Sequence, residues 1–304
     1  VELKKIDPNI VLIAHPSIYL KNNDLDILPL SGISNSKTFH CNENGYYSVY
    51  ESDRYGFNNP NEEWNKNEIQ YFLLGDSFTH GACVNRPNDI SSQLRNLSKK
   101  NVLNVGMSSS GILSQYATLL EYFPKNTKKV LWLIYEGNDI QNLNKELKNQ
   151  ILYKYFDNYK FSQNLKNKQK SIDEIAKIKI NNKIKSYENE QSQFIKLYKT
   201  RQKFFNKKSY VYTEKFYNFT ALEKIISNGN KFVENNNSKL YLICLPAVQR
   251  YYLNFNFEVC DKLKKISIHQ KIPFLDLHKS LFSKNINVKE FFPLFKKKPV
   301  HYSV

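Results

Sequence analysis

The sequence lacks two features that would narrow its class at once: a long apolar run and a closely spaced pair of cysteines. A membrane span needs about 18 consecutive apolar residues, whereas the longest apolar runs, at Val130–Tyr135 and Leu240–Val248, have the length of a strand. The four cysteines are Cys41, Cys83, Cys244 and Cys260. They form no CxxC pair, so we expect neither a structural zinc site nor a disulfide-rich scaffold. Two disulfides or four free thiols fit the count equally well, so the cysteines leave the compartment open.

Acidic residues are scarce relative to basic ones. The chain has 28 Asp and Glu against 45 Lys and Arg, a formal net charge of +17 over 304 residues. A basic chain can bind nucleic acid, anionic glycans or a membrane surface. The excess is mostly lysine and is spread along the chain, so we interpret it as a solvated surface. No zinc finger, RNA-binding aromatic motif or basic region with heptads is present, and we expect no nucleic-acid partner.

The composition indicates a folded protein, and the first residue bears on whether the N-terminus has been cleaved. Hydrophobic residues make up 41% of the chain and aromatic residues 14%, which is ample for a core and excludes a wholly disordered protein. Val1 is not a natural initiator. We therefore expect that an N-terminal piece has been removed, and such a piece is where a signal sequence or a membrane anchor would lie. Membrane association through that piece stays open.

The chain falls into a short irregular part and a long regular one. Residues 1–68 carry an Asn44-Gly45 turn signal ahead of a strand-like segment at Tyr46–Glu51, which predicts a small β-rich N-terminal apron packed on the core. From residue 69 to 304, apolar runs of strand length alternate with segments of helix length. The runs are 70–74, 101–105, 129–135, 239–244 and 272–276. This alternation predicts an α/β domain with a parallel sheet covered on both faces.

One interval interrupts the alternation. Residues 141–220 contain no proline and no glycine and show a weak helical periodicity. They are too many for an ordinary connection between two elements. We interpret them as a helical insertion between the third and fourth strands, and we expect it to border the functional site.

Chemically useful residues follow the first three strands. Gly75-Asp76-Ser77 comes directly after the first, Gly106 after the second and Gly137-Asn138-Asp139 after the third. Because the carboxyl ends of parallel strands meet at one edge of a sheet, we expect these residues to lie close together. A serine hydroxyl, a glycine N–H and an amide, joined by His301, are the set that acyl transfer requires: a nucleophile, oxyanion donors and a base.

These segments, taken in order along the chain, resemble the sequence blocks of the SGNH (GDSL-type) hydrolase superfamily. That resemblance implies a flavodoxin-like three-layer α/β/α sandwich with a mainly parallel five-stranded sheet. It also implies one of three activities, those of an esterase, a lipase or a carbohydrate O-acyltransferase, with no cofactor and no metal. Tyr55-Gly56-Phe57-Asn58 further resembles bacterial members linked to surface-polysaccharide modification. The substrate implied is an O-acylated carbohydrate or another ester, with an acyl donor if the protein is a transferase, and the bacterial cell envelope or periplasm is favoured over the cytoplasm.

The resemblance also assigns roles to residues. It implies Ser77 as the nucleophile and His301 as the general base. It implies an oxyanion hole made by the backbone N–H groups of Ser77 and Gly106 and by the Asn138 side chain. Asp76 and Asp139 are candidates for supporting roles, since the sequence places them beside the nucleophile and the amide donor.

Most other residues with reactive side chains are expected to be structural. His80 belongs to the start of the helix after Ser77. His278, after the fifth strand, is a rival to His301 as the base. Cys83 is interpreted as a small packing residue rather than a reactive thiol. Asp139 anchors its loop rather than binding metal, because no second carboxylate stands at ligand spacing.

The sequence departs from the family at the residue that would orient the histidine. The family commonly has Asp three residues before the histidine, whereas this chain has Lys298. Three arrangements are open: a backbone carbonyl accepts the His301 Nδ1 proton, a distant carboxylate such as Glu290 or Asp276 does so, or the site is weakened. We favour the backbone carbonyl. The alternative function is a catalytically silent glycan-binding protein that uses the same cleft.

Overall fold

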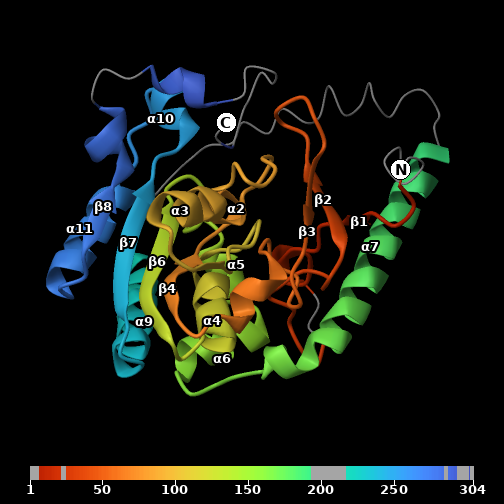
Figure 1. Ribbon diagram of the computed structural model, residues 1–304. Coiled ribbons are helices and arrows are strands. Elements are labelled where there is room, and N and C mark those ends of the chain that lie inside the picture. The colour runs from red at the N-terminus through yellow and green to blue at the C-terminus, as the bar shows by residue number, and fades with distance from the viewer. Residues whose placement is uncertain (1–6, 22–24, 193–216, 284–286, 293–300, 302–304) are drawn as a thin grey trace.

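A five-stranded, all-parallel sheet forms the centre of the molecule (Figure 1). The computed structural model describes residues 7–21, 25–192, 217–283, 287–292 and 301. The strands are β4 (Ile69–Leu74), β5 (Val102–Asn104), β6 (Thr127–Tyr135), β7 (Lys239–Leu245) and β8 (Phe274–Asp276), in the spatial order β5-β4-β6-β7-β8. Counted along the chain this order is 2-1-3-4-5, that of flavodoxin-like sheets. The predicted fold class is confirmed.

The strands are apolar on both sides because both faces of the sheet are covered. In β4, Phe72 and Leu74 belong to the larger hydrophobic cluster and Leu73 belongs to a second one. The same alternation holds in β6, where Trp132 belongs to the first cluster and Leu133 to the second. A strand buried on both faces therefore reads as a continuous apolar run, without polar alternation.

Helices complete the two outer layers. They are α3 (Ile90–Ser98), α4 (Ile112–Tyr122), α9 (Phe219–Asn235) and α11 (Val259–His269). Side chains of α4, α9 and α11 belong to the larger cluster, while Ile90 and Leu94 of α3 pack against the second one. The connection from β4 to β5 runs one way along the sheet, and the connection from β5 to β6 runs back past β4 in the opposite direction. Because both crossovers are right-handed, their helices α3 and α4 lie on opposite faces of the sheet. Among the described helices, none has the length and the apolar character of a membrane span.

The N-terminal apron is a three-stranded sheet that shares the core. Its strands are β1 (Val11–Leu12), β2 (Lys37–Cys41) and β3 (Ser48–Glu51), in the order β1-β2-β3. Tyr19, Leu28 and Phe57 are fully buried in the larger cluster, so the apron is packed on the α/β core. In Figure 1 these strands lie between the main sheet and the long helix α7 (Gln169–Ser192).

The segment expected as a helical insertion is largely helical over its described part. Its elements are α5 (Leu143–Glu146), α6 (Gln150–Asp157), η3 (Leu165–Lys168) and α7, and residues 193–216 lie outside the described residues. Leu152 and Leu165 have no exposed surface and belong to the main core. The buried Glu146 carboxylate accepts the N–H groups of Gly111 (2.9 Å) and Leu113 (3.0 Å) at the start of α4. This first stretch is therefore part of the core and supplies the cap of a central helix.

We predict that Glu146→Ala destabilises the whole domain. The change leaves buried N–H groups of α4 without an acceptor, which should lower the free energy of unfolding by roughly 2–4 kcal/mol. Urea denaturation followed by circular dichroism measures the loss. The matched control is Glu174→Ala on the exposed side of α7, which should change stability by less than about 0.5 kcal/mol. Equal stability of both variants would mean that α4 is not held by Glu146.

Candidate active site

Ser77 stands where the strand order of the sheet reverses. It is the first residue of α2 (Ser77–His80), directly after β4, and Asn138 follows the neighbouring strand β6. Open α/β sheets bind ligands at such a switch point, beyond the carboxyl ends of the strands. Asp76 caps the short helix, because its Oδ1 accepts the Phe78 N–H at 3.0 Å. A Cβ on Gly75 would lie 2.6 Å from the Leu133 carbonyl oxygen, so only glycine fits at this turn.

The structure brings the expected nucleophile and base together. Ser77 Oγ lies 2.8 Å from His301 Nε2, although 224 positions separate the two residues in the chain. The imidazole ring packs against the Phe78 ring, with 5.1 Å between the centroids. Ser77 is 8% exposed, so the pair lies just beneath the surface.

The other ring nitrogen of His301 faces a carboxylate from the apron. Glu43 Oε2 lies 3.1 Å from His301 Nδ1 and 3.3 Å from the His301 backbone nitrogen. The expectation of a backbone carbonyl at Nδ1 is therefore wrong. The two carboxylates considered as substitutes bond elsewhere: Asp276 Oδ1 accepts the Lys279 N–H, and Glu290 Oε1 accepts the Asn287 amide.

Glu43 was not among the residues singled out from the sequence. It lies in the Asn-Gly turn after β2, which the sequence marked only as a turn. No spacing rule joins it to His301, because the two are 258 positions apart. Lys298, which stands at the family's usual Asp position, lies outside the described residues.

The expected oxyanion donors differ in what they offer. The Gly106 N–H already donates to Asn104 Oδ1 at 2.8 Å, so it is not a free donor, contrary to the expectation. Gly106 instead allows close packing, since a Cβ there would lie 2.7 Å from the His80 backbone nitrogen. The Asn138 side chain is half-buried, and its buried Oδ1 has no hydrogen-bond partner within the described part of the chain. Asn138 follows β6 at the edge of the sheet where Ser77 follows β4, so its side-chain amide remains a candidate donor.

Two buried carboxyl groups support this edge of the sheet. Asp76 Oδ2 lies 3.3 Å from Ser77 Oγ, and Asp139 Oδ2 accepts the Tyr135 N–H at 3.0 Å. Burial raises the pKa of Asp76. Burial, joined by the negative charge of Asp76, raises the pKa of Asp139 well above the usual range. Asp139 thus closes the loop that carries Asn138, and its environment favours the neutral acid.

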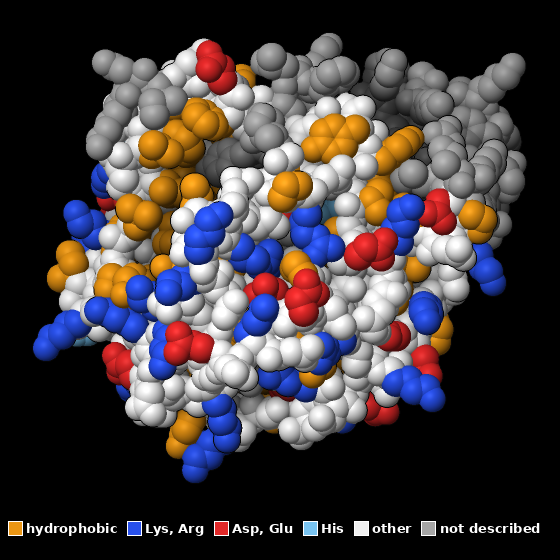
Figure 2. All heavy atoms as spheres, in the orientation of Figure 1, with side chains coloured by type: hydrophobic (Ala, Val, Ile, Leu, Met, Phe, Trp, Pro, Cys, Tyr) orange, Lys and Arg blue, Asp and Glu red, His pale blue; other side chains and the backbone are white. Residues whose placement is uncertain are grey.

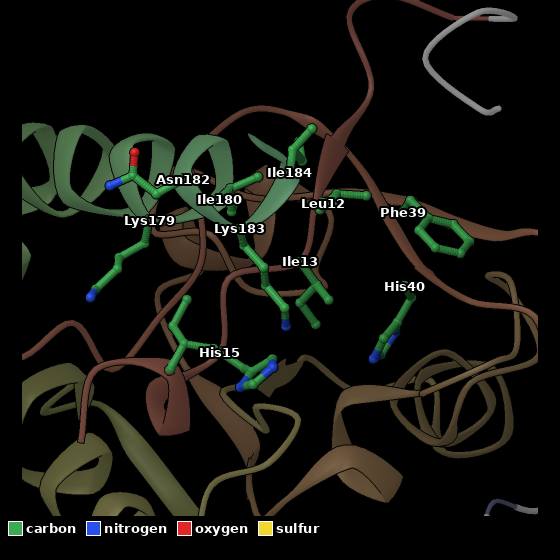
Figure 3. A pocket seen from close by; sticks show the side chains of 11 residues that line it. Leu12, Ile13, His15, Phe39, His40, Lys179, Ile180, Asn182, Lys183 and Ile184 are labelled. Atoms are coloured by element: carbon green, nitrogen blue, oxygen red, sulfur yellow. The ribbon is translucent and has the colours of Figure 1, made fainter. Parts of the chain in front are cut away.

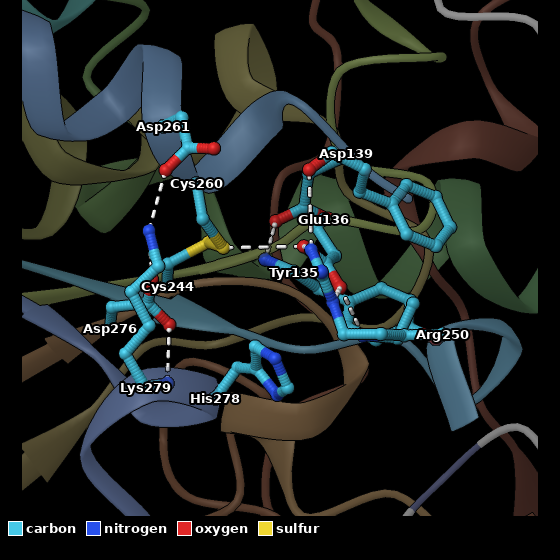
Figure 4. Close-up of a disulfide and its surroundings, with 12 residues drawn as sticks. Tyr135, Glu136, Asp139, Cys244, Arg250, Cys260, Asp261, Asp276, His278 and Lys279 are labelled. Atoms are coloured by element: carbon cyan, nitrogen blue, oxygen red, sulfur yellow. Dashed lines mark hydrogen bonds and ion pairs between the residues drawn. A yellow bond between two sulfur atoms is a disulfide. The ribbon is translucent and has the colours of Figure 1, made fainter. Parts of the chain in front are cut away.

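All four cysteines form disulfides, Cys41–Cys83 and Cys244–Cys260. The interpretation of Cys83 as a packing residue is wrong, because it is covalently tied to the apron. Its sulfur, the Glu43 carboxylate and His301 have ligand atoms within 4.8 Å of one another, but a disulfide sulfur has no thiolate to offer a metal. The second disulfide joins β7 to α11 beside the buried Glu136–Arg250 ion pair (2.7 Å), as Figure 4 shows.

The remaining histidines serve the surroundings of the site. His80 Nδ1 accepts the Ser108 N–H at 3.1 Å, and burial lowers the pKa of His80 to about 3, so its ring is neutral. His40 Nε2 lies 2.6 Å from Ser108 Oγ. His278, the rival base, pairs with the Tyr251 hydroxyl at 2.9 Å.

A cavity of about 630 Å³ lies between the apron and α7. Figure 3 shows His15 and His40 on the apron side and Lys179 and Lys183 on the helix side. The other walls are mostly aliphatic. Through the contact of His40 with Ser108, and of Ser108 with His80, this cavity is linked to the helix that begins with Ser77.

No family model matches the chain, and no curated protein matches it. Among solved structures, it is similar to one from Desulfitobacterium hafniense DCB-2 that is described as a lipolytic protein of the G-D-S-L family. The sequence identity is 15%, the match covers 76% of this chain and 91% of that chain, and the TM-score is 0.38. At this level of similarity the likeness bears on neither substrate nor catalytic residues.

We predict that Gly106→Ala damages both stability and the position of Ser77. The added methyl group would lie 2.6 Å from Thr79 Cβ and 2.7 Å from the His80 nitrogen, and the backbone atom cannot turn away. Overpacking of this kind costs about 1–3 kcal/mol. Thermal unfolding measures the stability, and the rate of Ser77 modification by a serine-directed phosphonate measures the position of α2. An unchanged melting temperature with an unchanged labelling rate would contradict the prediction.

Proposed function

We propose that this protein is a serine-dependent acyl-transfer enzyme that acts on esters. The observation that carries the proposal is the 2.8 Å contact between Ser77 Oγ and His301 Nε2 at the switch point of the sheet. His301 Nε2 takes the hydroxyl proton while Ser77 Oγ bonds to the ester carbonyl carbon. The tetrahedral intermediate then expels the alcohol, which leaves with that proton, and an acyl-enzyme remains.

Donors for the oxyanion are available at the same edge. The proposed donors are the Asn138 side-chain amide, in the loop after β6, and the Ser77 N–H at the start of α2. Such donors stabilise charge that develops in the transition state, and one donor typically contributes 10²–10³-fold in kcat. Gly106 is left out of this group because its N–H is bonded to Asn104.

The substrate class we propose is an O-acylated carbohydrate. The acyl group would pass from Ser77 to water in an esterase, or to a sugar hydroxyl in an O-acyltransferase supplied with an acyl donor. The motif Tyr55-Gly56-Phe57-Asn58 supports this choice, as does the cavity beside α7, where His40, Lys179 and Lys183 suit the hydroxyl or acidic groups of an extended glycan. The reaction needs no cofactor.

The surface charge indicates whether nucleic acid is a partner, and the disulfides indicate the cellular compartment. On the face seen in Figure 2, Lys and Arg side chains are interspersed with Asp and Glu. This pattern favours a solvated surface over a nucleic-acid groove. Two disulfides are typical of proteins from oxidising compartments, so we propose the cell envelope or periplasm.

We predict that Ser77→Ala abolishes acylation while the fold persists. Loss of a covalent nucleophile typically lowers kcat by about 10⁴–10⁶-fold. Turnover of p-nitrophenyl acetate and mass spectrometry of the phosphonate-treated protein measure the effect. The matched control is the exposed Ser283→Ala, which should behave as the wild type. If Ser77→Ala turned over the ester at the wild-type rate, the proposed mechanism would be wrong. If the wild-type protein bound glycans but Ser77 was never acylated, the function would be glycan binding and not catalysis.

We predict that Asn138→Ala lowers kcat by about 10²–10³-fold with little change in KM, because its amide is expected to act on the transition state. Asn142→Ala in the same loop is the control, since the Asn142 side chain does not cap α5. Steady-state kinetics on a small aryl ester separate the two parameters. A change in KM alone would make Asn138 a substrate ligand and not an oxyanion donor.

A further inference from the structure

A turn of the apron is fastened to the loop that follows the nucleophile. Cys41, at the end of β2, is bonded to Cys83, six residues after Ser77. The Asn44 side-chain amide donates to the Cys83 carbonyl oxygen at 2.8 Å, and Ser48 Oγ donates to the Val84 carbonyl oxygen at 3.1 Å. The turn between β2 and β3 is thus held at both of its ends.

This fastened turn carries Glu43 to the far side of the His301 ring. One carboxylate oxygen, Oε2, lies within reach of both the ring Nδ1 (3.1 Å) and the backbone N–H (3.3 Å) of the same histidine. The side chains of Glu43 and His301 are each 15% exposed. A carboxylate that accepts Nδ1–H keeps the Nε2 lone pair directed at Ser77 and stabilises the imidazolium that forms when Nε2 takes a proton.

We propose that Glu43 is the positioning acid of a Glu43–His301–Ser77 triad, and that the Cys41–Cys83 disulfide braces it. This inference rests on the acyl-transfer function proposed above. Glu43 stays ionised throughout: the proton of the Ser77 hydroxyl moves to His301 Nε2, and the Nδ1 proton stays on the ring. In this proposal the apron belongs to the catalytic machinery. Among the described segments, only the apron brings a carboxylate to His301 Nδ1.

The other groups around His301 do not fit this role. Asp76 is a carboxyl group, but it contacts the Ser77 hydroxyl and caps α2, so it is on the nucleophile's side of the ring. The Cys83 sulfur lies 3.8 Å from Nδ1, and a disulfide sulfur is at best a weak acceptor without charge. Among the described residues, only Glu43 has both the charge and the contact with Nδ1.

The decisive experiment is Glu43→Gln in the full chain. The amide keeps the shape but not the charge, and in serine enzymes such a replacement of the acid lowers kcat by about 10⁴-fold. We expect a fall of about 10²–10⁴-fold in kcat on p-nitrophenyl acetate with KM changed less than about twofold. Glu51→Gln, an exposed glutamate of the same apron, is the matched control and should keep the wild-type rate. Wild-type kcat in Glu43→Gln, beside an inactive Ser77→Ala, would overturn the triad and leave the proposed function standing.

Two further measurements keep the proposal testable whatever the activity or folding of that variant. Glu43→Asp keeps the charge on a shorter side chain, and we expect it to regain part of the lost kcat, which a merely structural role would not produce. A far-downfield proton resonance from His301 Nδ1–H should appear in the wild type and vanish in Glu43→Gln. This signal reports the contact even if the wild type hydrolyses no ester, and its absence from the wild type would overturn the assignment.

The brace is tested with the two disulfides as a matched pair. Cys41→Ala with Cys83→Ala releases the turn that carries Glu43, and a misplacement of about 1 Å can cost 10²-fold in rate. We expect kcat to fall by about 10–10²-fold. Cys244→Ala with Cys260→Ala removes the bond between β7 and α11 and should lower the melting temperature while kcat at 20 °C stays near the wild type. An unchanged kcat in the first pair would show that the disulfide does not hold Glu43.

Discussion

The hydrogen bond between Ser77 and His301 is the contact on which the proposed chemistry depends, and several distant parts of the chain are needed to form it. The end of β4 fixes Ser77, and Gly75 and Gly106 let the backbone of α2 lie close to its neighbours. His301 comes from a segment 224 positions later. Glu43 holds it from the opposite side, so the ring lies between the α/β core and the apron.

Buried carboxylates recur as the groups that fix loops in this fold. Asp53 accepts the N–H groups of Tyr55 and Phe57 in the apron. Glu136, directly after β6, accepts the Ala247 N–H and the Arg250 guanidinium. Each such group costs free energy to bury unless its oxygens are bonded. The bonds that offset this cost also fix the loops around the carboxyl edge of the sheet. Glu43 likewise uses its carboxylate to fix a neighbouring group, the His301 side chain.

The sequence predicted the sheet because apolar runs of strand length need little context to be recognised. It also placed Ser77 and Asn138 at one edge, because strands that alternate with helices run parallel and their carboxyl ends meet at the same edge. It did not find Glu43, because a contact across 258 positions leaves no local periodicity. The same holds for the Cys41–Cys83 pairing, and for Asn104, whose side-chain oxygen accepts the Gly106 N–H. Side-chain partners across the fold were thus the part that local patterns could not supply.

The order of these residues along the chain has a consequence during synthesis. Ribosomes make proteins from the N-terminus, at about 5–20 residues per second, so Glu43 and Ser77 are made early and His301 is made more than 200 residues later. Until then the Ser77 hydroxyl has no imidazole to accept its proton and remains an ordinary alcohol. On the proposed mechanism, a growing chain is therefore unreactive toward esters until residue 301 has been made and lies against Ser77 and Glu43.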